Sequence, residues 1–428
     1  MAIISLAPSL VLSQGNPALV DKLAARPFDL DYAAFRDSAT GNLSVEIFYK
    51  VFSSGLSYQK WGDKFKADYT VDITVNKKGK QITGSSNDGS LIADDYKMSK
   101  SKDDFVINKI VFSLAPDNYQ LVARLSDPNS GEALEPVKID MPLKSLGDEI
   151  PGLSTLEFAR EASYSQSDSE FIKGGMRIIP SVSRVYGDEE PNLILYYEIY
   201  NRPEFAGDYF ATYQILNNDK TVSWDSSLFV CSGPATPRIE TIRVDDLLPG
   251  EYDVVANISS PGGKLHLKTR DQFKIGWSVM GLVKNDFKTA LEQLRYIATP
   301  DQMKKLADAP VEDRIRLWDE YWKSKDPTPS TPENELKDEY YKRLRYSDIN
   351  FGNFGRNGWK TDMGMIYVTY GPPDEIERHP FDLDSKPYQI WNYYHSNGLQ
   401  RIFRFVDVYG YGEYELMYPY DGDPRKIR

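Results

Sequence analysis

Cysteine, histidine and long apolar runs are scarce in this chain of 428 residues, and each scarcity excludes a class of site. The single cysteine, Cys231, rules out an intramolecular disulfide and any multi-cysteine metal centre. The three histidines, His266, His379 and His395, have no zinc-type spacing, and neither a phosphate-binding glycine loop nor a Gly-x-Ser-x-Gly turn occurs. No stretch reaches the ~20 apolar residues of a membrane-spanning helix. We therefore expect no cofactor, no metal site and no integral membrane span.

Basic residues are also in deficit. The chain has 63 acidic and 51 basic residues, a formal net charge of −12. The negative electrostatic potential of such a chain repels the phosphate backbones of nucleic acids, so we expect no nucleic-acid partner. The composition is otherwise that of a folded protein, with 29 tyrosines and 19 phenylalanines. Its length suggests about three domains.

The first residues resemble the end of a secretory signal. Residues 1–14 contain an apolar segment that ends in small residues, but they lack the basic start of a complete signal. We interpret residues 1–14 as a truncated signal-like segment and expect an exported protein, periplasmic or extracellular. The rival interpretation is a cytoplasmic protein whose first residues dock on a core. No cysteine follows the segment, so a lipoprotein anchor is not supported.

Residues 28–146 have the pattern of a β-sandwich. Apolar side chains alternate with polar ones over residues 43–51 and again over 69–75, as in half-buried strands. Turn signals recur about every ten residues and no helical period intervenes. The first domain is therefore predicted to be all-β.

Residues 152–275 look like a second copy of the same unit. Residues 114–123 and 248–256 both pass from a proline-containing turn to a tyrosine and an apolar strand. Asn42-Leu43 and Asn192-Leu193 open an earlier strand in each unit. A tight turn before a tyrosine is similar to the corners of immunoglobulin-like sandwiches. We expect two tandem immunoglobulin-like sandwiches.

Such sandwiches serve either as spacers or as recognition modules. For recognition, Tyr196, Tyr197, Tyr200 and Trp224 are candidates for an exposed aromatic face. Neighbouring residues of a strand point to opposite sides, so at least one of Tyr196 and Tyr197 should lie in the core.

After Trp277 the apolar period changes from two to 3.6, which predicts helices. Starts are expected at Asn285, at Thr299 with Pro300 in the first turn, at Pro310 and at Thr331. The third helix should bury a stripe that comprises Val311, Ile315, Trp318 and Trp322. Four helices then fit within roughly sixty residues.

The last part of the chain alternates again. Residues 365–370 are predicted to form a short strand that leads into a rigid Gly371-Pro372-Pro373-Asp374 corner. Further strands are expected at 389–394, 399–406 and 414–418. These predict an antiparallel meander packed on the helices, an α+β domain, with residues 421–428 as a tail.

Several motifs in this region occur in a recognisable order: Trp322, Asp326 to Thr331, Asn334-Glu335, Tyr340-Tyr341-x-Arg343, Gly358-Trp359-x-Thr361-Asp362, Gln389 to Tyr393 and Phe403 to Asp407. In this order they resemble the C-terminal domain of the bacterial GWxTD family, over about residues 283–420. The resemblance implies an α+β domain. It implies no activity, because none is established for that family.

The motif that gives the family its name is Gly358-Trp359-x-Thr361-Asp362, which we call the name motif. It has a structural and a functional interpretation. In the first, Gly358 adopts a positive φ, Trp359 buries its ring, and Thr361 and Asp362 accept bonds from turn amides. In the second, the motif and the corner form a site at the mouth of the meander. The candidate residues are Gly358, Trp359, Thr361, Asp362, Tyr370, Gly371, Pro372, Pro373, Asp374 and Glu375.

Three functions remain open. We favour a non-enzymatic exported cell-envelope binding or scaffold protein whose C-terminal domain docks a partner, either an envelope protein or a glycan. The first alternative is a glycan-binding protein. The second is a hydrolase that pairs Asp362 with Asp374 or Glu375, since glycoside hydrolysis uses two carboxylates. The sequence leaves the oligomeric state open.

Overall fold

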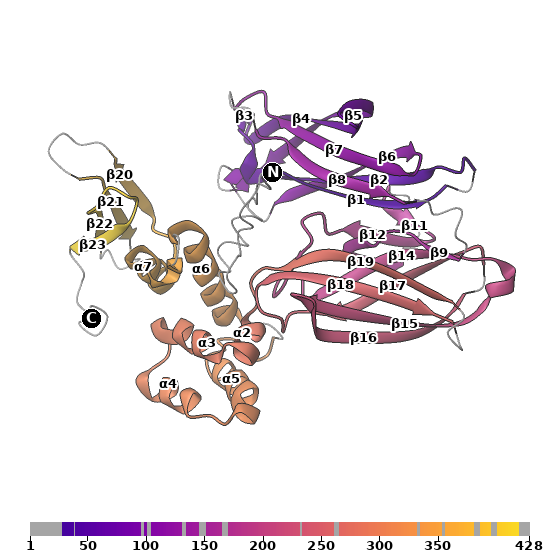
Figure 1. Ribbon diagram of the computed structural model, residues 1–428. Helices are drawn as coiled ribbons and strands as arrows, with labels where there is room; N and C mark the ends of the chain where they lie inside the picture. The colour runs from indigo at the N-terminus through magenta and orange to yellow at the C-terminus, as the bar shows by residue number, and fades with distance from the viewer. Residues whose placement is uncertain are drawn as a thin grey trace, which may run out of the picture. The chain divides into compact units, whose positions relative to one another are not determined.

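The computed structural model describes residues 28–418 except for the segments 38, 96–97, 101–103, 131–133, 145–150, 165–169, 232, 261–264, 332–333, 353–355, 381–385 and 395–399. The expected signal-like segment at 1–14 and tail at 421–428 lie outside the described residues. The chain divides into two compact units (Figure 1). The β-rich unit comprises residues 28–245 and 251–276, and the C-terminal unit comprises 246–250 and the residues from Trp277 onward.

The β-rich unit begins with two facing sheets, which we call the first sheet pair. One sheet contains β1 (Phe28–Arg36), β2 (Leu43–Phe52) and β6 (Phe105–Leu114), and the other contains β3 (Gln59–Trp61), β4 (Lys64–Lys77), β5 (Lys80–Ala93), β7 (Asp117–Ser126) and β8 (Val137–Leu143). Their inner faces share one buried core, in which alternate residues such as Val45 and Ile47 of β2 meet Val71 and Ile73 of β4. The alternating apolar residues of the predicted pattern are therefore the ones that face inward on each strand.

A second sheet pair follows. One sheet contains β9 (Gly152–Leu153), β10 (Glu157–Tyr164), β11 (Ile172–Lys173), β12 (Met176–Pro180), β14 (Asn192–Tyr200) and β17 (Ala235–Arg243), and the other contains β13 (Val185–Tyr186), β15 (Gly207–Asn217), β16 (Lys220–Cys231), β18 (Gly250–Ser259) and β19 (His266–Ile275). Tyr197 of β14 and Tyr213 of β15 are both buried, and their hydroxyls form a hydrogen bond of 2.6 Å from one sheet to the other. Cys231 is buried at the end of β16.

The two sheet pairs have the same strand order. The order β1-β2-β6 faces β5-β4-β7-β8, and the order β10-β14-β17 faces β16-β15-β18-β19. The sequence matches fall at equivalent places, because Leu43 and Asn192 open β2 and β14. The two proline-containing turns likewise lead into β7 and β18. The internal repeat is thus a repeat of topology.

Side chains join the two sheet pairs within this unit. Phe35 and Phe48 of the first pair lie in one buried cluster with Ile178 and Tyr196 of the second. Ion pairs surround this cluster and link Arg184 to Asp31 at 2.7 Å, and Lys173 to both Glu46 and Glu157. Such packing differs from the expectation that the sandwiches act only as spacers, because independent spacers need no common core.

The C-terminal unit starts with helices α2 (Val279–Asn285), α3 (Phe287–Gln293), α4 (Pro300–Ala307), α5 (Arg314–Lys323) and α6 (Glu335–Phe351). Thr299 and Gln302 form the capping box that starts α4, in agreement with the predicted start. The helix expected to start at Asn285 is α3, but its cap is the next residue, Asp286, which accepts the Thr289 N–H. Asn285 instead ends α2, an additional short helix that Ser278 caps by accepting the Gly281 N–H.

Helix α5 buries only half of its predicted stripe. Trp318 and Trp322 lie in the helical core, but Val311 and Ile315 are exposed. The reason is that Val311–Asp313 form a separate 3₁₀ turn and α5 begins at Arg314. Within the described residues, no helix combines the length and the apolar character needed to cross a membrane.

The unit ends in helix α7 (Asp362–Tyr370) and a four-stranded antiparallel meander: β20 (Glu375–His379), β21 (Tyr388–Tyr394), β22 (Gln400–Asp407) and β23 (Tyr414–Tyr418). The predicted meander is confirmed, but the predicted strand at 365–370 is wrong. That segment is helical, and its apolar residues serve two cores. Met363 and Ile366 pack on the meander, whereas Val368 packs on the helices. A helix covered on both sides loses the one-sided apolar stripe that would have identified it.

Candidate functional site

The name motif begins with a 3₁₀ turn, Gly358–Lys360, pressed against α6. A Cβ atom on Gly358 would lie 1.9 Å from the carbonyl oxygen of Ser347, and one on Gly364 would lie 1.9 Å from the carbonyl oxygen of Gly358. Both positions therefore require glycine because backbone approaches backbone. The expected positive φ at Gly358 is not found; close approach is the reason for this glycine.

Trp359 is a core residue. Its side chain is fully buried in the helical core. The backbone N–H of Trp359 donates to Asp348 Oδ1 at 3.3 Å, and its backbone carbonyl accepts from the Tyr296 hydroxyl at 2.7 Å. The ring is thus unavailable to a ligand, which supports the structural interpretation for this residue.

Thr361 and Asp362 attach α7 at two points. Thr361 Oγ1 accepts the Gly364 N–H at 3.0 Å and donates to the Gly358 carbonyl at 2.6 Å, so it both caps α7 and closes the turn. Asp362 lies in the first turn of α7, and its Oδ2 accepts the Leu416 N–H at 2.9 Å. The expected bond to a turn amide therefore holds for Thr361, whereas Asp362 reaches across to β23.

The corner after α7 is also held by backbone contacts. Gly371 has a φ of +83°, which glycine adopts without strain, and its carbonyl accepts the Tyr393 hydroxyl at 2.9 Å. The ring of Tyr370 packs against Tyr393 and Phe403 in the meander core. These residues fix the angle at which the meander leaves the helix.

The two corner carboxylates bind the end of β21. Asp374 Oδ2 accepts the Tyr394 N–H at 2.6 Å, and Glu375 Oε2 accepts the Tyr394 hydroxyl at 2.8 Å. Neither belongs to the residues that line the groove described next, although Asp362 does. The structure therefore does not bring the proposed catalytic pair into one cavity.

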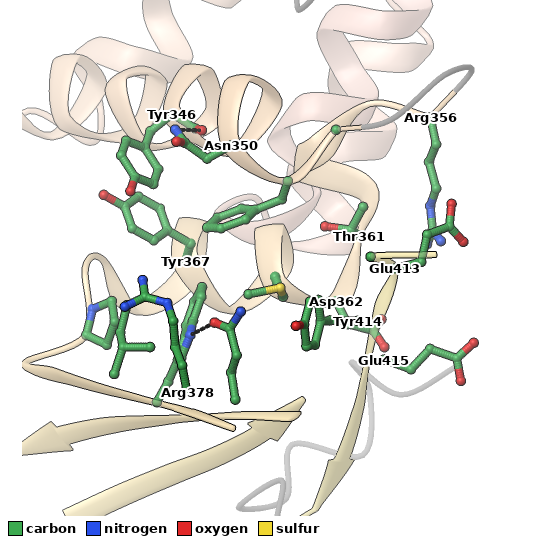
Figure 2. A pocket seen from close by; sticks show the side chains of 18 of the residues that line it. Tyr346, Asn350, Arg356, Thr361, Asp362, Tyr367, Arg378, Glu413, Tyr414 and Glu415 are labelled. Carbon is green, nitrogen blue, oxygen red and sulfur yellow. Dashed lines mark hydrogen bonds between the residues drawn. The ribbon is translucent and has the colours of Figure 1, made fainter. Parts of the chain in front are cut away.

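A groove of about 490 Å³ lies between the end of α6, α7, the corner and the meander (Figure 2). Four candidates line it: Thr361, Asp362, Pro372 and Pro373. The lining also includes residues that the sequence did not single out, among them Tyr346, Asn350, Phe351, Arg356, Met363, Tyr367, Ile376, Arg378, Gln389, Trp391, Tyr411, Tyr414 and Glu415.

Stacked aromatic rings form one wall of the groove. Tyr346 of α6 and Tyr367 of α7 stack in parallel with ring centroids 4.3 Å apart. Phe351 packs edge-on against Tyr367 and continues the wall toward buried Trp391. These residues come from two helices and a strand, so neither spacing nor composition groups them.

Arg378 places a positive charge beside this wall (Figure 2). It is exposed on β20, and its side chain makes no ion pair or hydrogen bond with another residue in the described part of the chain. Burial raises the pKa of the Tyr346 hydroxyl, and the positive charge of Arg378 opposes that shift. Glu415 lines the groove as an exposed acid on β23. The groove thus combines stacked aromatics with charges of both signs.

Three carboxylates line the groove: Asp362, Glu413 and Glu415. Asp362 accepts the Leu416 N–H, and the described histidine of this unit, His379, stacks on Tyr388 outside the groove lining. The described residues contain no group of three or more His, Cys, Asp or Glu side chains that could hold a metal. This arrangement suits binding through aromatic and charged contacts.

The aromatic face suggested for the second sheet pair does not form from the four candidate residues. Tyr196, Tyr197 and Tyr200 are all buried. Tyr196 and Tyr197, which are adjacent in the strand, therefore both belong to cores. Trp224 is exposed, with 69% of its surface accessible.

Helices followed by an antiparallel meander define the C-terminal unit as an α+β domain, preceded by β-sheets. Residues 283–420 match the model of the GWxTD domain, and this region is therefore a GWxTD domain. No curated protein matches the chain.

Two solved structures are weakly similar. A putative beta-galactosidase from Bacteroides fragilis is 11% identical with a TM-score of 0.18, and the match covers 53% of this chain. This chain spans 32% of that protein. CBD12 from CALX1.2 is 13% identical with a TM-score of 0.17, covering 51% of this chain and 76% of that one.

Proposed function

We propose that this chain is a non-enzymatic binding or scaffold protein of the cell envelope, whose GWxTD domain docks a protein partner in the groove beside Asp362. The observation that carries the proposal is the juxtaposition of the stacked pair Tyr346 and Tyr367 with the exposed Arg378. Tyrosine and arginine are the side chains most enriched at the energetic centres of protein interfaces. The groove presents both.

The partner we propose is an extended peptide segment that carries a carboxylate. Arg378 offers a planar fork of donors, which matches a carboxylate in two parallel hydrogen bonds. The neighbouring rings offer flat apolar surface that loses little conformational entropy on binding. A volume of about 490 Å³ accommodates a few side chains rather than a whole domain surface.

We also propose that the two sheet pairs are immunoglobulin-like sandwiches. Each pair sets a three-stranded order against a four-stranded order. Equivalent neighbours are antiparallel, for example β2 with β6 and β14 with β17, and β4 with β7 and β15 with β18. At the corner before β7, the Tyr119 hydroxyl donates to the carbonyl of Ala115, four residues upstream, at 3.0 Å. A tyrosine that ties back to the preceding backbone is a hallmark of that fold.

The two alternatives have less support. A hydrolase needs its two carboxylates on opposite sides of one bound substrate. Asp362 lines the groove, but Asp374 and Glu375 are held by Tyr394 outside it. A glycan-binding face needs several exposed coplanar rings, and of the four suggested aromatics Trp224 alone is exposed.

The docking proposal is tested with a photo-reactive phenylalanine analogue in place of Tyr346, in the full chain in its native cells. We expect a discrete cross-linked adduct that is lost when Arg378→Glu is added. The matched control is Lys288→Glu, an equal charge reversal at an exposed position of α3 outside the groove. An adduct that survives Arg378→Glu, or one that both reversals abolish equally, contradicts the proposal.

Export is tested separately, with alkaline phosphatase fused after the last residue of the chain. The enzyme becomes active only where disulfides form, outside the cytoplasm. We expect active phosphatase. An inactive but intact fusion would support the cytoplasmic alternative.

A further inference from the structure

The outer face of the β15–β16 hairpin carries a stripe of exposed apolar side chains. On β16 the stripe comprises Trp224, Leu228 and Val230, with 69%, 77% and 59% of their surfaces accessible, and Val222. On β15, exposed Phe210 lies directly opposite Leu228. Contiguous apolar patches of this kind on a soluble protein commonly mark an interaction surface.

The stripe lies on an open edge. β16 is the last strand of the sheet β13-β19-β18-β15-β16 in the described part of the chain, so one side of its twelve-residue backbone faces no strand there. Natural proteins protect long edges with proline, charge or glycine-rich breaks. The edge strands β17 and β8 contain Pro237 and Pro142, and β5 contains Gly84 and Gly89. β16 has neither proline nor glycine, and its edge is interrupted only by Asp225 and by the bulge at Val222 near its start.

The sequence of β16 is self-complementary. Two copies that pair antiparallel about a twofold axis through Ser226 place Trp224 opposite Leu228 of the second copy. Directly opposed residues share a face of the sheet, so Trp224 and Leu228 of both copies fall on the outer face. Val230 continues this face at one end, and Val222 lies at a bulge of β16 at the other.

Other registers satisfy the strand less well. A shift of one residue turns the buried Phe229 and Cys231 of one copy to the outer face of the other. Moving the axis to Asp225 keeps the faces but places Trp224 opposite Ser226 of the second copy and opposes the two Asp225 side chains. Moving it to Ser227 pairs Trp224 with Val230 but places Leu228 opposite Ser226. In the register centred on Ser226, Asp225 meets a serine and no like charges are opposed. Of these registers, the one centred on Ser226 opposes the two large side chains Trp224 and Leu228 and brings no like charges together.

We propose that this face is the interface of a homodimer, in which β16 pairs with β16 of a second copy about a twofold axis through Ser226. An isologous pairing of this kind is closed, because both copies use the same strand edge. It also joins the two stripes into one band across the junction, where cross-strand pairs of aromatic and aliphatic residues stabilise a sheet. The proposal does not depend on the groove.

The first experiment places a cysteine on the proposed axis. In Ser226→Cys, the two thiols are expected to face each other with Cα atoms about 4.5 to 5.5 Å apart, within disulfide range. Mild oxidation of the full chain should give a covalent dimer on a non-reducing gel. The control is Ser223→Cys on the same strand, whose counterpart in the second copy is Phe229, so no dimer should form. Equal cross-linking of both variants, or of neither, overturns the proposal.

The second experiment measures mass by light scattering after size-exclusion chromatography. The wild-type chain at about 100 µM should be a dimer, and Trp224→Lys should be a monomer with an unchanged melting temperature. Val111→Lys, at an exposed position of β6, should remain a dimer. A monomeric wild type, or a dimeric Trp224→Lys, overturns the proposal.

Discussion

Replacing Asp362 separates the structural from the catalytic interpretation of the name motif. Its carboxylate accepts the Leu416 N–H at 2.9 Å and stands in the first turn of α7. The side chain is half-buried, so water screens part of both effects. We expect Asp362→Ala to destabilise the C-terminal unit and Asp362→Asn to destabilise it less, because the amide oxygen can still accept a bond.

The magnitude follows from two contributions. A hydrogen bond to a charged group contributes about 1.5 to 3 kcal/mol net, and half-exposure favours the lower part of that range. An acid near a helix N-terminus adds roughly 0.3 to 1 kcal/mol. We therefore expect a loss of about 2 kcal/mol for Asp362→Ala. For Asp362→Asn, which loses mainly the charge, we expect about 1 kcal/mol.

Tryptophan fluorescence during urea unfolding reports this loss directly. Five of the seven tryptophans belong to the C-terminal unit, and all five are buried, among them Trp318, Trp359 and Trp391. Asp301→Ala is the control, because Asp301 is a first-turn acid of α4 that lies at an exposed position. It should cost at most about 1 kcal/mol, the helix-end contribution alone.

The reasoning is refuted if Asp362→Ala unfolds at the wild-type urea concentration. The hydrolase hypothesis predicts the reverse pattern, in which Asp362→Asn abolishes turnover of a glycoside substrate and leaves stability unchanged.

Three further predictions concern single positions. Gly358→Ala should lose about 3 kcal/mol or more by the same fluorescence assay, because the added carbon would overlap the Ser347 carbonyl, and wild-type stability would contradict the close approach. Thr361→Val should lose about 1 to 2 kcal/mol while Thr361→Ser recovers most of it, since only the hydroxyl caps α7; equal losses would refute the cap. Burial raises the pKa of Glu157 to about 7, against the opposing charge of Lys173, so the folded state binds this proton more tightly than the unfolded chain does. The resulting stability is full below about pH 4.5 and is lost as pH rises through 7. Thermal unfolding of Glu157→Gln should therefore show a smaller stability loss between pH 5 and 8 than the wild type, and an identical loss would contradict this account.

Strand positions were predictable from the sequence where a strand has one buried face and one solvent-exposed face. β2 and β4 show this clearly, because alternate residues such as Val45 and Val71 enter one core. The start of α4 was predictable for a local reason, since Thr299 and Gln302 satisfy each other's backbone within one turn. Both signals lie within a few residues of sequence.

The prediction of a strand in place of helix α7 was wrong because this helix is buried on two sides. Residues 365–370 alternate by chance, and the true determinants are the cap at Thr361 and the two cores reached by Ile366 and Val368. The joint between the sheet pairs was also invisible, because Arg184 meets Asp31 across 153 residues of chain. Tertiary contacts decided both features.

The candidate site was half predictable. The motif drew attention to Thr361 and Asp362, which do line the groove. Tyr346, Tyr367 and Arg378 carry no local signature, since they meet only when α6, α7 and β20 pack together. The sequence motif identified the connection between α7 and the meander. The groove beside it arises only from tertiary packing.

Hydrogen exchange at the Leu416 amide tests the central claim most directly, namely that the name motif joins α7 to the meander. Asp362→Ala removes the single side-chain acceptor observed for this amide, at 2.9 Å in the wild type. Under native conditions we expect exchange at Leu416 to accelerate by about tenfold or more, corresponding to ~1.4 kcal/mol of local opening, beyond any change at Trp318 in the helical core. Unchanged protection at Leu416 would contradict the account.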